Sequence, residues 1–127
     1  MSAPGLWPCL TYVDAPAAIR FLVDALGFEE RARHPGEREG EVAHAELRWP
    51  EGGGVMLGSV RPGGLPAPAG TGLVYGQTAD PDALHDRAVA AGAEVVRGLQ
   101  DTDYGSREFA VRDPEGVVWS FGTYAGT

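Results

Sequence analysis

The distribution of hydrophobic and polar positions along the chain predicts the same order of elements twice. In the first half, a strand at 6–13 is followed by a helix whose apolar residues recur at helical spacing, and then by three strands. The second half repeats that order, beginning with a strand at 73–78 and a helix that starts at Asp80. Gly27 and Gly92 follow the two helices, as left-handed caps do. The pattern therefore predicts a duplicated module of one strand, one helix and three strands.

Two similar turns fix the spacing of this repeat. Asp-Pro-Glu-Gly at 113–116 joins the last two strands, and Trp-Pro-Glu-Gly at 49–52 stands 64 positions earlier. The expected helix caps, Asp14 and Asp80, are 66 positions apart. A Gly- and Pro-rich segment at 61–71 separates the halves and is predicted to be a linker. The two closing turns can therefore be used to match positions between the halves.

Length and charge narrow the classes of function. The 127 residues suffice for a single domain, 1–127, made of modules at about 6–60 and 72–124. The net charge of −8 argues against a nucleic-acid partner, whose phosphates require a basic surface. No apolar run approaches the roughly 20 residues of a membrane span, and no signal peptide is visible, so we expect no membrane partner and a cytoplasmic location. Lysine is absent, which excludes lysine chemistry, and the single cysteine, Cys9, excludes an internal disulfide.

The chain resembles the vicinal-oxygen-chelate superfamily, which contains glyoxalase I, extradiol dioxygenases, fosfomycin-resistance enzymes and bleomycin-resistance proteins. The resemblance is carried by Pro-Cys-Leu-Thr-Tyr at 8–12, His-Ala-Glu-Leu at 44–47 and the ending at 113–124. It implies an α+β fold in which duplicated βαβββ modules form a cupped, mixed β-barrel, and it also implies a homodimer. In that superfamily a metal, when present, is held at the centre of the cup by His, Gln or Glu side chains.

The matching positions of this chain do not carry such ligands. Seven residues before the two helix caps stand Trp7 and Leu73, and the corresponding positions of the two last strands are Met56 and Ser120. Trp and Leu donate nothing to a metal ion, Met is a soft thioether, and Ser alone is a weak ligand. The resemblance therefore predicts the scaffold of the superfamily with neither its metal nor any other cofactor.

Alternation along the strands adds neighbours of these positions to the expected lining of the cup. The expected ligand-binding residues are Trp7, Cys9, Met56, Leu73, Tyr75, Gln77, Ser120, His44 and Glu46. The candidates for acid–base catalysis are His44 and Glu46, which together with His34 also make an alternative, unconventional metal site. A simpler interpretation is that Trp7, Met56 and Leu73 fill the barrel, that His44 lies on a solvated strand face, and that Cys9 is buried and inert.

The function that this pattern favours is that of a metal-free small-molecule-binding protein, similar to the bleomycin-resistance type. It would sequester an aromatic or cationic antibiotic-like ligand, and the acidic charge of the chain suits a cation. The alternative is a lyase, isomerase or dioxygenase of the same superfamily, either with unconventional metal ligands or without a metal. A third hypothesis is a barrel with a filled interior and only an interaction role.

Overall fold

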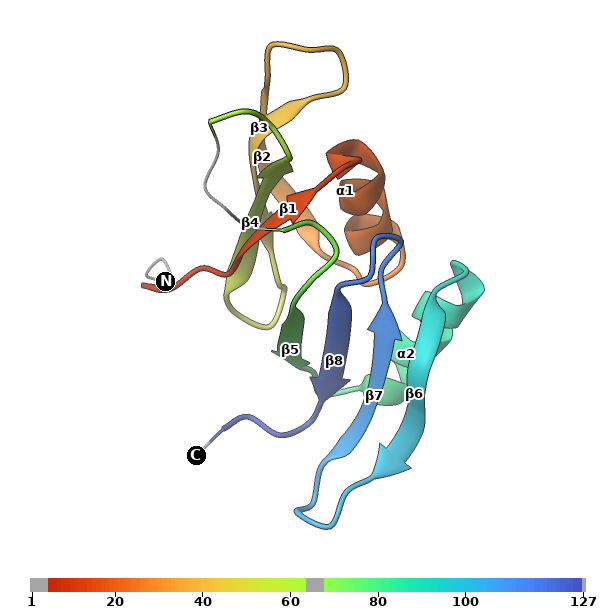
Figure 1. The fold of residues 1–127 in the computed structure, drawn as a ribbon. Helices are drawn as coiled ribbons and strands as arrows, with labels where there is room; N and C mark the ends of the chain where they lie inside the picture. The colour runs from red at the N-terminus through yellow and green to blue at the C-terminus, as the bar shows by residue number, and fades with distance from the viewer. Residues whose placement is uncertain (1–4, 64–67, 127) are drawn as a thin grey trace.

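The computed structural model describes residues 5–63 and 68–126, which fold into two four-stranded sheets with one helix each (Figure 1). The first module consists of β1 (Cys9–Tyr12), α1 (Ala15–Asp24), β2 (Glu29–Pro35), β3 (Val42–Arg48) and β4 (Gly54–Ser59). The second consists of β5 (Leu73–Gln77), α2 (Pro81–Ala90), β6 (Glu94–Asp101), β7 (Arg107–Arg112) and β8 (Val118–Gly122). The strand orders, β1-β4-β3-β2 and β5-β8-β7-β6, are equivalent. The predicted α+β fold with two βαβββ modules is confirmed, and part of the predicted linker, 64–67, lies outside the described residues.

Both helices begin where the sequence predicts. The Asp14 carboxylate accepts a hydrogen bond from the backbone N–H of Ala17 at 3.1 Å, and Asp80 accepts one from Ala83 at 3.0 Å. The buried residues of α1 are Ala15, Ala18, Ile19 and Leu22, and those of α2 are Pro81 and Ala88. Of the helices formed by residues 5–63 and 68–126, none is long and apolar enough to cross a membrane.

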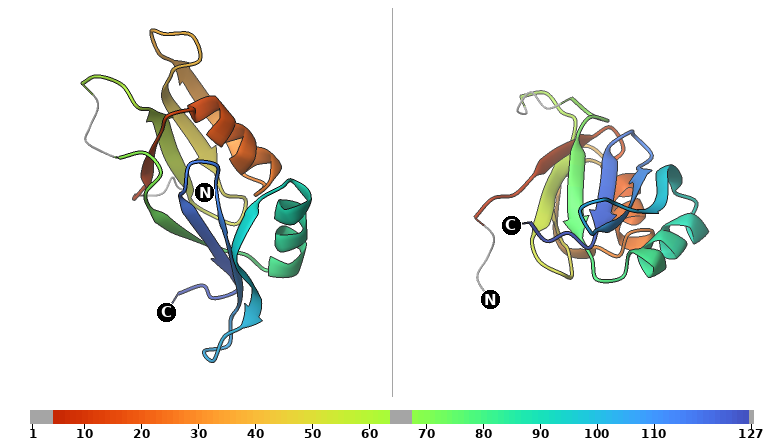
Figure 2. Two further views of the ribbon diagram at one scale, coloured as in Figure 1. Left: turned by 45° about the vertical axis from the view of Figure 1, so that its right-hand side comes forward. Right: turned by 90° about the horizontal axis from the view of Figure 1, so that it is seen from below.

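One hydrophobic core is shared by the two modules. The ring centroid of Phe28 lies 5.4 Å from that of Trp119, and the rings of Trp49 and Phe121 are 5.1 Å apart. Aromatic side chains of the first module therefore pack directly on those of the second. The two helices lie on the same side of the molecule (Figure 2), where Arg87 of α2 donates hydrogen bonds to two backbone carbonyls at the end of α1.

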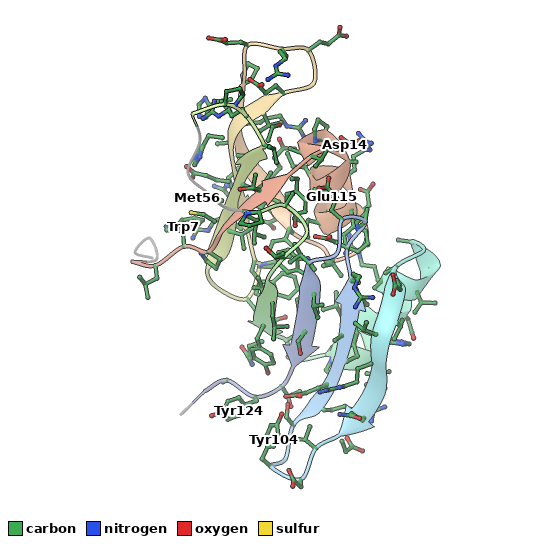
Figure 3. The ribbon with its side chains drawn as sticks, in the orientation of Figure 1. Trp7, Asp14, Met56, Tyr104, Glu115 and Tyr124 are labelled. Atoms are coloured by element: carbon green, nitrogen blue, oxygen red, sulfur yellow. The ribbon has the colours of Figure 1, made fainter. Side chains whose placement is uncertain are left out.

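Each closing turn also contacts the other module. Glu115 accepts hydrogen bonds from the backbone N–H groups of Val13 and Asp14, both at 2.7 Å, and lies beside the start of α1 (Figure 3). Glu51, the equivalent residue of the first turn, accepts one from the N–H of Ala79 at 2.9 Å, just before α2. The repeat that is visible in the sequence thus corresponds to a reciprocal exchange of contacts between the modules.

The sheet faces that point away from this shared core carry the residues expected to line the cup. We call them the first outer face (Cys9, Thr11, His44, Glu46, Met56 and Gly58) and the second outer face (Leu73, Tyr75, Gln77, Glu108, Ser120 and Gly122). Within the described residues the two sheets are not joined into a closed barrel. The modules pack through their inner aromatic side chains, so the outer faces are not turned toward each other in a single chain.

Candidate functional site

The first outer face carries a pocket of about 310 Å³ over β1, β3 and β4. The register pairs Cys9 with Met56 and Met56 with Glu46, so these three side chains form a row across the sheet. His44 lines the same pocket together with Thr11. Cys9 is exposed, which contradicts the interpretation of a buried thiol; β1 is an edge strand, and Cys9 is on the side of the sheet away from the core.

His44 and Glu46 are joined by a hydrogen bond of 2.9 Å between Nε2 and Oε2, and both side chains are partly exposed. The ring of His34 stacks on that of His44, with centroids 6.0 Å apart. The alternative metal site is not found, because within the described residues no three His, Cys, Asp or Glu side chains are grouped so that they could hold a metal ion. The arrangement instead presents an imidazole, oriented by a carboxylate, at the wall of the pocket.

The four positions matched to the metal ligands of the superfamily remain without a donor set. Trp7 packs over Gly54, and the guanidinium carbon of Arg48 lies 5.9 Å from its ring centroid. Met56, on β4, presents only a thioether. Leu73 and Ser120 lie on the other sheet. An indole, a thioether, an alkyl group and one hydroxyl do not fit a divalent ion.

The structure divides the predicted binding residues into two sets. Trp7, Cys9, Met56, His44 and Glu46 lie at the first sheet, whereas Leu73, Tyr75, Gln77 and Ser120 lie at the second. In the second set, Tyr75 is opposite Ser120 in the register, and its hydroxyl donates a hydrogen bond of 2.6 Å to the carbonyl oxygen of Tyr124. Leu73 is 71% exposed, so it does not fill an interior in a single chain.

A second pocket, of about 240 Å³, lies at the junction between the modules. Its lining includes the aromatic side chains of Phe28, Trp49 and Phe121, together with Tyr75 and Gln77. The indole N–H of Trp49 is already bonded to the backbone oxygen of Gln77 at 2.8 Å. This junction was not expected from the sequence, because it is formed by segments that are far apart in the chain.

Sequence reasoning also missed Glu108 on the second outer face. This residue is only 6% exposed, and one of its carboxylate oxygens accepts a hydrogen bond of 2.9 Å from the hydroxyl of Tyr104. That hydrogen bond is the main reason why the pKa of Tyr104 is raised. The pKa of Tyr75 is also raised, first by burial and then by the charge of Glu108. Alternation with the core residues Phe109 and Val111 is the sequence signal that places Glu108 on this face.

A profile of the Glyoxalase/Bleomycin resistance protein/Dioxygenase superfamily matches residues 7–121. An uncharacterized protein of Mycobacterium bovis is 39% identical over 127 residues, covering 94% of this chain and 82% of that protein. An uncharacterized protein of Mycobacterium tuberculosis (strain H37Rv) is also 39% identical, with 74% of its length covered.

Solved structures agree with these sequence matches. TioX from Micromonospora sp. ML1 superposes with a TM-score of 0.76 at 33% identity, covering 93% of this chain and 98% of TioX. A glyoxalase/bleomycin resistance protein from Streptomyces sp. CB03234 has a TM-score of 0.66 at 27% identity, covering 90% and 97% of the two chains.

Proposed function

The chain belongs to the Glyoxalase/Bleomycin resistance protein/Dioxygenase superfamily, and from that premise we propose that it binds a small organic molecule without using a metal ion. The observation that carries the proposal is the pocket of the first outer face, which is lined by Cys9, His44 and Met56 beside positions that lack a metal donor set. A partly apolar pocket with a few polar groups suits an organic ligand better than a metal chelate. Sequestration of an aromatic or cationic, antibiotic-like compound in the cytoplasm is the role that we propose.

We further propose that the protein acts as a homodimer, in which an outer face of one chain is covered by an outer face of the other. Two four-stranded sheets that are not closed into a barrel leave these faces uncovered within the described residues. Leu73, at 71% exposure, is a large hydrophobic side chain on the second outer face that a partner would bury. Light scattering of the purified chain tests this part, and a monomer at micromolar concentration would contradict it.

The binding role is tested with the neutral aromatic dye N-phenyl-1-naphthylamine, whose fluorescence rises in apolar surroundings. We expect saturable binding that is lost in Cys9→Trp, because the indole fills the pocket of the first outer face. Val89→Trp adds the same side chain at an exposed position of α2 and should leave binding unchanged. Equal binding by both variants would place the dye elsewhere. Stoichiometric metal coordinated by outer-face side chains would overturn the metal-free role.

The hydrogen bond between His44 and Glu46 favours one second candidate, a metal-free enzyme that uses His44 as an acid or base. A lyase or isomerase could use such a group to move a proton on a ligand in the same pocket. The two roles differ in their response to His44→Gln. A binding protein keeps most of its affinity for its ligand, whereas an enzyme keeps its affinity and loses turnover by about a hundredfold or more.

A further inference from the structure

Tyrosine rings gather around a buried carboxylate at one end of the second outer face. Tyr75, Tyr104 and Tyr124 are 41%, 60% and 44% exposed, whereas Glu108 is 6% exposed. The rings of Tyr104 and Tyr124 meet edge to face, with centroids 5.8 Å apart (Figure 3). Exposed aromatic rings with a carboxylate behind them are a combination that the packing of the shared core does not require.

The space for this cluster depends on Gly122. A Cβ atom at that position would lie 2.5 Å from Cγ of Glu108, 2.9 Å from the hydroxyl oxygen of Tyr75 and 3.0 Å from Oγ of Ser106. Gly122 is opposite Glu108 on one side and Gln77 on the other in the register of the sheet. The side chains of Glu108, Tyr75 and Ser106 therefore converge over a strand position that has no side chain of its own.

Among the described residues, no positive charge pairs with the carboxylate of Glu108. Arg107 pairs with Asp82 at 2.6 Å, and Arg112 pairs with Glu94 at 2.6 Å. Arg97 lies opposite Ala110, one row away on the same face of the sheet. In the part of the chain that the structure describes, no Arg or His nitrogen lies within ion-pair distance of Glu108. A buried carboxylate without a cation is costly, and a cationic ligand would offset that cost.

We propose that Tyr75, Tyr104 and Glu108 form a subsite for an alkylammonium group, quaternary or protonated, of a small-molecule ligand. The cation would rest on the exposed ring faces, which carry negative potential, while the carboxylate behind them adds its charge. The subsite rests on the proposed binding function and defines it further, because it assigns a cation to the ligand. It also gives the second outer face a role distinct from that of the pocket on the first.

Choline and its uncharged isostere 3,3-dimethyl-1-butanol test the subsite, with binding followed by NMR shifts of the tyrosine ring protons. We expect choline to bind saturably and the alcohol to bind at least about tenfold more weakly. Ethanolamine, which carries a protonated primary amine, distinguishes the two kinds of ammonium group. Similar binding of choline and of the alcohol would overturn the proposal, as would failure of both cations to bind.

Glu108→Gln keeps an acceptor for the Tyr104 hydroxyl and removes only the charge, so it should weaken choline binding by about tenfold. Glu39→Gln removes a charge from the exposed turn between β2 and β3 and serves as the matched control, with no expected change. If Glu108→Gln does not fold, Tyr104→Leu replaces an exposed ring and should weaken choline binding to a similar extent. Unchanged choline affinity in the charge or ring variant would show that the cluster has only a structural role.

The two proposals fail in distinguishable ways. Saturable binding of the naphthylamine dye that is lost in Cys9→Trp, together with no binding of choline, overturns the ammonium subsite and leaves the binding function in place. Failure of both the dye and choline to bind overturns both proposals.

Discussion

The turns that close the two modules begin with different residues, Trp49 in the first and Asp113 in the second. Trp49 contributes aromatic packing on Phe28 and Phe121 and donates its indole N–H to the backbone oxygen of Gln77. Asp113 is buried and acts as an acceptor. Its carboxylate accepts hydrogen bonds from the hydroxyl of Tyr12, from the indole N–H of Trp119 and from the backbone N–H groups of residues 115, 116 and 117.

Both residues nevertheless perform the same task, which is to fix the turn of one module against the strand that precedes the helix of the other. Trp49 reaches Gln77 at the end of β5, and Asp113 reaches Tyr12 at the end of β1. The repeat thus preserves where the modules touch while the chemistry of the contact differs. The outer faces differ in the same way: a thiol, a thioether and an imidazole mark the first, and tyrosines with a carboxylate mark the second.

Among substitutions in the two closing turns, the largest loss of stability is expected from Asp113→Ala. The substitution leaves the Tyr12 hydroxyl, the Trp119 indole N–H and the backbone of the turn without their shared acceptor. Unfolding in urea should show that the free energy of unfolding falls by about 3–5 kcal/mol. Asp113→Asn retains one acceptor oxygen and should lose less, about 1–3 kcal/mol. Equal losses in the two variants would mean that the hydrogen-bond network does not carry this contribution.

Trp49→Ala should have the next largest effect, because it removes an aromatic contact from the shared core. Since Trp49 is only partly buried, we expect a loss of about 2–4 kcal/mol in the same urea experiment. Trp49→Phe keeps a ring and loses the hydrogen bond to Gln77, at a cost of about 1 kcal/mol. If the Phe variant lost as much as the Ala variant, the hydrogen bond rather than the packing would define this turn.

Alkaline pH tests the contact of the second turn alone, which is the hydrogen bond from Tyr12 to Asp113. Burial, followed by the hydrogen bond to Asp113, raises the pKa of Tyr12 above its ordinary value. The contribution of Tyr12 to the free energy of unfolding is fully present below the unfolded-state pKa of about 10. It is lost as the pH rises above that value, because only the unfolded chain then ionises at this residue. Tyr12 should account for a fall of about 1.4 kcal/mol per pH unit in that window. The free energy of unfolding, measured in urea at several pH values above about 10, should therefore fall less steeply with pH in Tyr12→Phe than in the unchanged protein. An equal dependence on pH would contradict the assignment.

The sequence was sufficient for the elements and for the repeat, since these depend on local signals. Asp14 and Asp80 cap their helices as predicted, and the two closing turns stand at equivalent places. The polar composition of residues 100–104 is typical of a loop, but Gln100 and Asp101 extend β6 through pairing with β7. That extension depends on a partner strand, which no pattern within the segment reveals.

The arrangement of the site was less predictable, because it depends on which face of each sheet the rest of the chain covers. Alternation placed Cys9 and Met56 on one face, yet Cys9 is exposed rather than buried. Glu108 was not predicted, because the resemblance assigns the lining to the first and last strands of each module and Glu108 lies on β7. The hydrogen bond from Tyr12 to Asp113 joins residues 101 positions apart, which the local sequence of the turn does not reveal.

The smallest expected difference lies between the two glutamates that exchange contacts across the modules. Glu115 accepts two backbone N–H bonds and Glu51 accepts one, both just before a helix. Glu115→Ala should therefore cost about 1–2 kcal/mol and Glu51→Ala about 0.5–1 kcal/mol, within the range of helix-capping substitutions. Matched Gln variants keep an acceptor oxygen and should recover part of each loss in urea unfolding. Equal losses from the two Ala variants would mean that the repeat is energetically symmetric at this contact, so that the asymmetry between the modules is confined to Trp49, Asp113 and the outer faces.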